Sequence, residues 1–154
     1  MDMPQLTEAH QQLQLLVGNW VGQEKINPSP WDPLGGPAIG RVKNKLALNG
    51  FAVVQHYEQE RNGAINFRGH GVFTWFEPEK CYMLHWFDSF GATPNVMKGQ
   101  FEKNVLTLTS KGSFGHSKAV FDFSKEGTYY YRMDASQDGK EWYTFMEGTY
   151  EKKN

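Results

Sequence analysis

The chain has 154 residues, 15% of them aromatic, and a formal net charge of −1 at pH 7. One domain of this length can bury about two thirds of its unfolded surface, and a charge near zero provides no basic field for nucleic acid. The single cysteine, Cys81, excludes an internal disulfide, and no stretch has the apolar length of a signal peptide or membrane span. We therefore expect one cytoplasmic domain over residues 1–154, without a nucleic-acid or membrane partner.

The first expected elements are a short helix over about residues 7–16 and a strand over residues 19–26. Thr7 can cap the helix, and Leu13 and Leu16 belong to its apolar stripe. A helix of about ten residues is too short to be stable alone, so it must dock on the strands. An irregular stretch with three prolines follows at residues 27–36.

Trp31 lies within this irregular stretch and places a large apolar side chain on a surface loop. It either anchors its own loop or covers the mouth of a cavity.

Residues 39–89 are expected to form a meander of strands joined by tight turns. Asn49-Gly50 and Asn62-Gly63 are strong signals for two-residue hairpin turns, and Glu77-Pro78-Glu79-Lys80 supplies a third turn. These turns predict the pairs Val42–Tyr57, Tyr57–Arg68, Gln55–His70 and Val72–His85.

The predicted registers sort the meander into two faces, because strand side chains alternate. The outer face carries charges that pair across strands, among them Lys43, His56 and Glu58. The inner face carries Tyr57, Arg68, His70 and His85. A slip of one residue would move a whole strand's side chains to the other face, so this prediction is sharp.

Further short strands continue to about residue 151, separated by turn signals such as Lys103-Asn104 and Asp138-Gly139. Closing such a series removes the exposed sheet edges. The predicted fold is therefore all-β: a closed or nearly closed up-and-down antiparallel barrel of about ten strands over residues 19–151, with a short N-terminal helix.

Gly18-Asn19-Trp20-Val21-Gly22, after a helix and opening a strand, resembles the Gly-x-Trp signature of calycin barrels such as lipocalins, fatty-acid-binding proteins and nitrobindin-like proteins. The chain also resembles the bacterial domain-of-unknown-function family 1579 over nearly its whole length, in four segments: Pro28-Ser29-Pro30-Trp31-Asp32-Pro33, Phe67-Arg68-Gly69-His70-Gly71, Leu84-His85-Trp86-Phe87-Asp88-Ser89 and Phe145-Met146-Glu147-Gly148. This resemblance implies a lipocalin-like barrel with a central pocket and no established activity.

The likeness to nitrobindin-like proteins would imply haem bound by a late histidine. Here Glu24 stands where a further glycine of the signature would fall, and no histidine follows His116. Both departures weaken the haem hypothesis, and no cofactor is expected.

We expect the barrel to bind a small organic ligand with an apolar body and an anionic or carbonyl head. The expected ligand-binding residues are Trp20, Glu24, Trp31, Tyr57, Arg68, His70 and His85, with no catalytic residue and no metal ligand among them. Arg68 is a natural bidentate partner for Glu24, and that pair either seals the barrel or orients the ligand. The oligomeric state is expected to be a monomer or a homodimer.

Two alternatives stay open. His70 or His85 could act as acid–base groups of a small enzyme, although no nucleophile occurs in a recognisable elbow. A haem or metal carrier is the third hypothesis, with Glu24 completing a metal site beside the two histidines.

Overall fold

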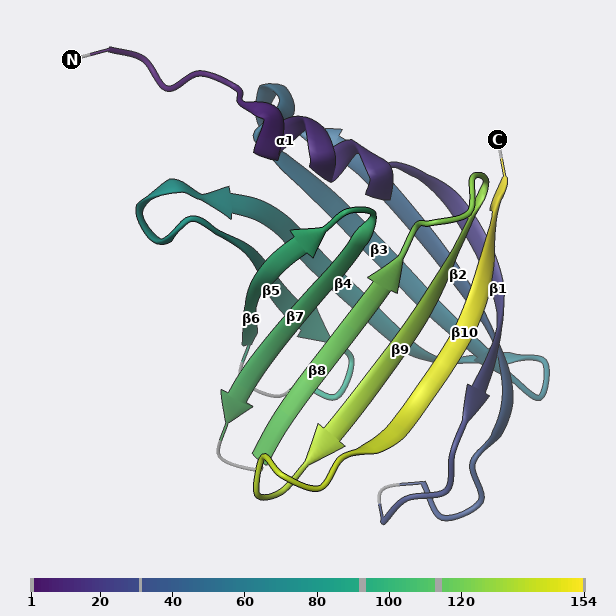
Figure 1. Cartoon of the computed structure of the whole chain (residues 1–154). Coiled ribbons are helices and arrows are strands. Elements are labelled where there is room, and N and C mark those ends of the chain that lie inside the picture. The colour runs from purple at the N-terminus through teal and green to yellow at the C-terminus, as the bar shows by residue number, and fades with distance from the viewer. Residues whose placement is uncertain (1, 31, 92–93, 113–114, 154) are drawn as a thin grey trace.

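The computed structural model describes residues 2–30, 32–91, 94–112 and 115–153, and it shows a barrel with a short helix across one end (Figure 1). The elements are α1 (Glu8–Gln12), the 3-10 helices η1 (Leu13–Leu16), η2 (Leu48–Gly50) and η3 (Glu77–Glu79), and the strands β1 (Gly18–Ile26), β2 (Gly36–Ala47), β3 (Ala52–Arg61), β4 (Ala64–Phe76), β5 (Cys81–Asp88), β6 (Asn95–Glu102), β7 (Val105–Gly112), β8 (Gly115–Asp122), β9 (Thr128–Ser136) and β10 (Tyr143–Lys153).

Within the described residues, each strand pairs antiparallel with its neighbours in the sequence, and β1 pairs with β10 to close the ring. The prediction of a closed up-and-down barrel of about ten strands with a short N-terminal helix is confirmed. No helix in the described part of the chain has both the length and the apolar composition needed to cross a bilayer.

Two of the three predicted registers are confirmed. The turn at Asn49-Gly50 pairs Val42 with Tyr57 across β2 and β3, and η3 pairs Val72 with His85 across β4 and β5. In the first turn Asn49 and Gly50 both have positive φ, as the hairpin signal requires.

The register between β3 and β4 differs from the prediction, because Asn66 is an extra residue in β4. Glu60 pairs with Ile65, but the next residue of β3, Gln59, pairs with Phe67. Such a β-bulge leaves one residue unpaired and shifts everything beyond it by one position. From Phe67 onward, β4 therefore presents to the interior the face that was predicted to lie outside.

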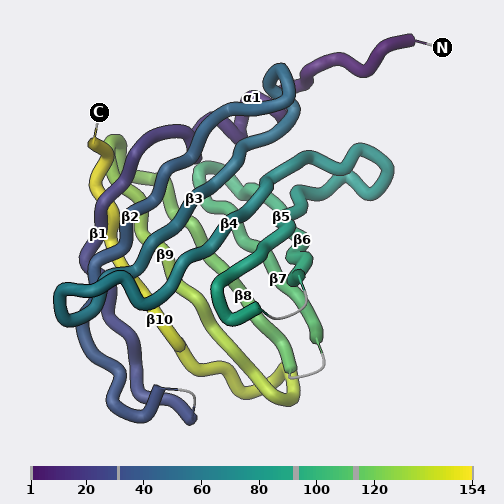
Figure 2. The backbone as a smooth tube through the Cα atoms, turned by 180° about the vertical axis from the view of Figure 1, so that it is seen from behind, coloured from purple at the N-terminus to yellow at the C-terminus, as the bar shows by residue number. Residues whose placement is uncertain are grey.

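The helical end of the barrel is plugged by η1. Leu13 and Leu16 are fully buried, and the Leu16 carbonyl accepts hydrogen bonds from the Trp20 indole (3.0 Å) and the Asn44 amide (2.8 Å). Seen from behind, α1 again lies at one end and the turn between β9 and β10 at the other (Figure 2). Docking on the barrel stabilises a helix that is too short to persist by itself.

Candidate ligand-binding cavity

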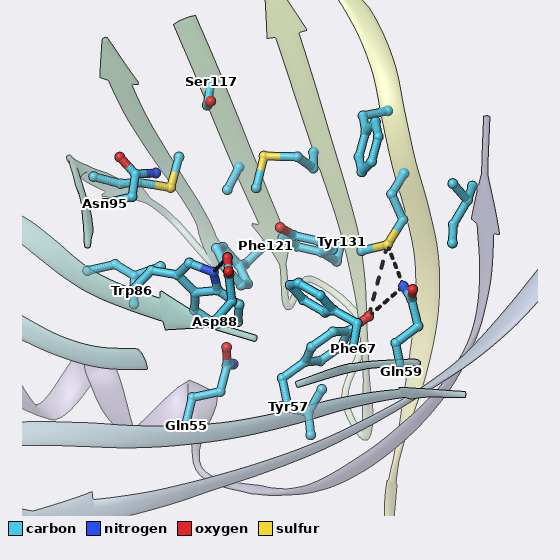
Figure 3. Close-up of a pocket in the computed structure, with 18 of the residues that line it drawn as sticks. Gln55, Tyr57, Gln59, Phe67, Trp86, Asp88, Asn95, Ser117, Phe121 and Tyr131 are labelled. Carbon is cyan, nitrogen blue, oxygen red and sulfur yellow. Dashed lines mark hydrogen bonds between the residues drawn. The ribbon is translucent and has the colours of Figure 1, made fainter. Parts of the chain in front are cut away.

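A cavity of about 770 Å³ occupies the barrel interior. Its walls are mainly aromatic and aliphatic side chains from strands around the ring (Figure 3): Phe67, Leu84, Trp86, Met97, Phe121, Tyr131, Met133 and Met146. Residues from the loops beyond the strands, Asp32 and Phe90, line it as well. This volume falls within the range of small-molecule sites, about 300–1,000 Å³.

The inner face of β4 explains why Trp86 can lie against the barrel wall. Gly69 and Gly71 leave space there: a Cβ atom at Gly69 would lie 2.1 Å from Trp86 Cζ2, and one at Gly71 would lie 2.8 Å from Leu84 Cδ1. The segment Phe67–Gly71 therefore has an aromatic and glycine face toward the cavity and an Arg68 and His70 face outside.

Glu24 of β1 is buried among hydrogen-bond donors of β3 and β10. Its Oε2 accepts hydrogen bonds from the hydroxyls of Tyr57 (2.6 Å) and Tyr150, and its Oε1 accepts one from Gln59 Nε2 (3.1 Å). Burial raises the pKa of the Glu24 carboxyl, while the three donors act in the opposite direction. A Cβ atom at Gly40 would lie 2.2 Å from Oε2, so the carboxyl fills the space that this glycine leaves open.

The predicted partner of Glu24 was wrong. Arg68 lies outside the barrel with its side chain 63% exposed and pairs with Glu58 at 3.1 Å. Glu24 makes no ion pair with any residue that the structure describes. A buried carboxyl without a cation depends on hydrogen bonds to offset its lost hydration, and here they come from two tyrosines and a glutamine.

The inward placement of His70 and His85 was also wrong. His70 lies opposite His56 on the outer face, and His85 lies opposite Val72 on the same side of the sheet. The error in the β3–β4 register carried over to β5, since the β4–β5 register was correct. The enzyme and metal alternatives both required these histidines inside, and neither lines the cavity.

Within the described residues, no group of three or more His, Cys, Asp and Glu side chains could hold a metal ion.

Among the other predicted site residues that the structure describes, Tyr57 alone lines the cavity. Trp20 is buried, but it packs edge-on against Phe123 and Tyr129 near the helical plug. Trp31 lies outside the described residues. The structure therefore brings Glu24 and Tyr57 together and separates them from Arg68, His70 and His85.

Several polar residues that line the cavity were not among the predicted site residues, and Gln55 and Arg61 show two different reasons. Gln55 was correctly predicted on the inner face of β3, and its position one alternation before Tyr57 was the signal that could have added it to the site. Arg61 was missed because its partners are distant in sequence: its guanidinium pairs with Asp32 and donates to the Gly35 carbonyl (2.5 Å). The hydrogen bond from Arg61 lowers the pKa of Asp32.

Several solved structures share the fold. The crystal structure of Rv2717c from M. tuberculosis matches with a TM-score of 0.70 and 13% identity, covering 97% of this chain and 100% of that one. The S-type phycobiliprotein lyase CPES from Guillardia theta matches with a TM-score of 0.66 and 11% identity, covering 98% and 99%. No protein with a curated description matches the chain. The family described as protein of unknown function, DUF1579, matches residues 5–152.

Proposed function

We propose, for a chain that belongs to the DUF1579 family, that the barrel binds one small, largely apolar molecule with an uncharged polar head. The observation that carries this proposal is the cavity of about 770 Å³, which the protein's own side chains leave unfilled. An apolar, aromatic-walled cavity with a few polar groups is the usual form of a small-molecule site. Barrels of this size hold one ligand when side chains do not fill them.

The charges around the cavity favour an uncharged head over an anionic one. The anionic expectation depended on Arg68, which lies outside. Arg61 lines the cavity, but Asp32 and the Gly35 carbonyl already occupy its guanidinium. Asp88 and Asp134 also line the cavity, so an added carboxylate would meet more like charge than opposite charge. The proposed ligand therefore has a carbonyl head and not an anionic one.

Tyr57 contributes its ring to this site, because its hydroxyl already donates to Glu24. Glu24 then acts as a positioning residue that holds Tyr57 and Gln59 at the wall. One of the structurally similar proteins is named a phycobiliprotein lyase. At 11% identity that likeness concerns the fold, so the support for a ligand comes from the cavity itself.

Binding of the uncharged dye N-phenyl-1-naphthylamine tests this proposal, with dye fluorescence as the readout. Ala135 lines the cavity, and Ala135→Trp should obstruct it and weaken binding at least tenfold. Arg68→Met and His85→Ala change the outer face and should leave binding unchanged. Undiminished binding by a folded Ala135→Trp protein, with its melting temperature measured in parallel, would overturn the proposal.

A further inference from the structure

The side chain of Gln55 is a buried amide that faces the cavity without a partner. It is 6% exposed and makes no hydrogen bond to any residue that the structure describes, and its amide atoms, unlike Asn44 Oδ1, are not fully enclosed, because they border the cavity. Figure 3 shows the amide directed into the cavity, on the side where Trp86 and Asp88 lie. Polar groups in protein interiors are nearly always hydrogen-bonded, so the partner of this amide has to come from whatever occupies the cavity.

One internal candidate is Asn44, which lies directly opposite Gln55 on β2. Asn44 Nδ2 donates to the Leu16 carbonyl, while its Oδ1 is enclosed and has no partner among the described residues. The Gln55 amide nevertheless does not turn to Asn44. It borders the cavity instead.

We propose that Gln55 recognises an amide-like edge of the ligand, in which an N–H donor stands beside a carbonyl acceptor, as in a lactam or a carboxamide. This inference rests on the proposed function and names the polar head of the same ligand. A primary amide has one donor and one acceptor side by side, so it forms two parallel hydrogen bonds with such an edge. A site built for both bonds discriminates strongly against an analogue that lacks one of them.

The neighbourhood of Gln55 favours a ligand that carries an N–H group. The Asp88 carboxylate already accepts hydrogen bonds from Trp86 Nε1 (3.0 Å) and the Phe90 amide (3.0 Å), and an ionised carboxylate can only accept. A purely acceptor head, such as an ester, would leave the Gln55 carbonyl without a donor. A lactam satisfies both ends of the amide.

The test compares three probes with similar apolar bodies: 2-quinolone, N-methyl-2-quinolone and naphthalene, titrated against the protein by ligand-observed NMR. We expect the wild type to bind 2-quinolone at least tenfold more tightly than its N-methyl analogue. Gln55→Leu and Gln55→Met should lose this preference and still bind naphthalene. His56→Ala, on the outer face of the same strand, is the matched control and should keep it.

The outcomes separate the two proposals. Equal affinity of the wild type for 2-quinolone and N-methyl-2-quinolone would overturn the role of Gln55, as would a preference that survives in Gln55→Leu or Gln55→Met. The melting temperature of both Gln55 variants could also fall sharply while their folded fraction keeps the preference for 2-quinolone. That result would show that Gln55 stabilises the fold, by pairing with Asn44, and does not contact the ligand. Failure of all three probes, naphthalene included, would refute the proposed function itself.

Discussion

His56 of β3 and His70 of β4 face each other on the outside of the barrel, with their Nδ1 atoms 3.3 Å apart and their ring centroids 4.7 Å apart. This pairing exists only because the bulge at Asn66 shifts β4 by one residue. If Asn66 were paired with Gln59 in a regular ladder, His70 would lie opposite Gln55 and face the interior. One unpaired residue therefore decides which side chains of β4 line the cavity.

Deletion of Asn66 should be tolerated. Ile65 pairs with Glu60 and Phe67 pairs with Gln59, so removing the residue between them leaves a regular ladder with every downstream side chain on its present face. We expect a folded barrel that keeps dye binding, with a loss of about 1 kcal/mol or less in the free energy of unfolding. Circular dichroism, urea unfolding and the dye titration measure these outcomes.

The matched control is deletion of Val72, further along the same strand. The strand could then keep its later pairs only by turning Arg68 and His70 inward and Phe67 outward. This variant should fail to fold or lose the cavity. If both deletions behave alike, the bulge at Asn66 is not what sets the faces of β4.

Gly69→Ala should displace Trp86 from the cavity wall. The new Cβ atom would lie 2.1 Å from the indole ring, and overpacking of this kind costs about 1–3 kcal/mol. We expect a lower melting temperature and a shift in tryptophan emission. Gly112→Ala is the control, since no atom of the described residues, chain neighbours aside, lies within 4 Å of the place that its new methyl group would take. Equal effects of the two changes would contradict the close packing of Gly69 on Trp86.

Glu24 should make the protein less stable as the pH rises above 4.5, the ordinary pKa of its carboxyl. Burial raises its pKa in the folded state, so in the interval above 4.5 the folded protein binds more protons at this site than the unfolded chain does. Stability then decreases with increasing pH until the folded pKa is passed. Glu24→Gln cannot ionise and removes this decrease.

The measurement is the melting temperature of both proteins between pH 4 and pH 8. The wild type should lose stability relative to Glu24→Gln as the pH rises through the lower part of this range. Glu126→Gln changes an exposed turn residue, and its melting temperature should depend on pH in the same way as that of the wild type. If the melting temperature of the wild type instead rises relative to that of Glu24→Gln as the pH increases, the tyrosine hydrogen bonds lower the pKa of Glu24 by more than burial raises it.

Arg61 should hold the segment Asp32–Gly35 against the end of β3. Its guanidinium contacts both the Asp32 carboxylate and the Gly35 carbonyl, and Leu34 between them is 90% exposed. Arg61→Met should therefore speed thermolysin cleavage before Leu34 severalfold, as measured by mass spectrometry. Arg41→Met breaks an ion pair with Glu60 that does not involve this segment and should leave the cleavage rate unchanged.

The barrel itself was predictable because turn chemistry and alternation act locally. Asn49-Gly50 sets its register through positive φ values, and the strands around it follow. The bulge at Asn66 has no comparable signal, since a short polar residue near a turn fits either face. Gly69 and Gly71 did hold a clue. Two glycines on one face of a strand make room for large side chains, and a cavity wall with Trp86 needs such room.

The polar site was harder to predict than the fold for a different reason. Glu24 was expected to need a cation, and the predicted register placed Arg68 on the same interior face. The structure supplies hydroxyl and amide donors from β3 and β10 instead. Arg61 likewise depends on a segment 26 to 29 residues away, which no local pattern relates to it.

The hydrogen bonds of Glu24 also bear on the order in which the barrel assembles. Tyr57 reaches Glu24 from β3, 33 residues along the chain, whereas Tyr150 reaches it from β10, 126 residues away. Contacts between such distant segments carry the largest loop-closure cost and slow folding. We expect the β1–β10 seam to form last, so that the Glu24 carboxyl stays half solvated in a nearly complete sheet until Tyr150 arrives and the ring closes.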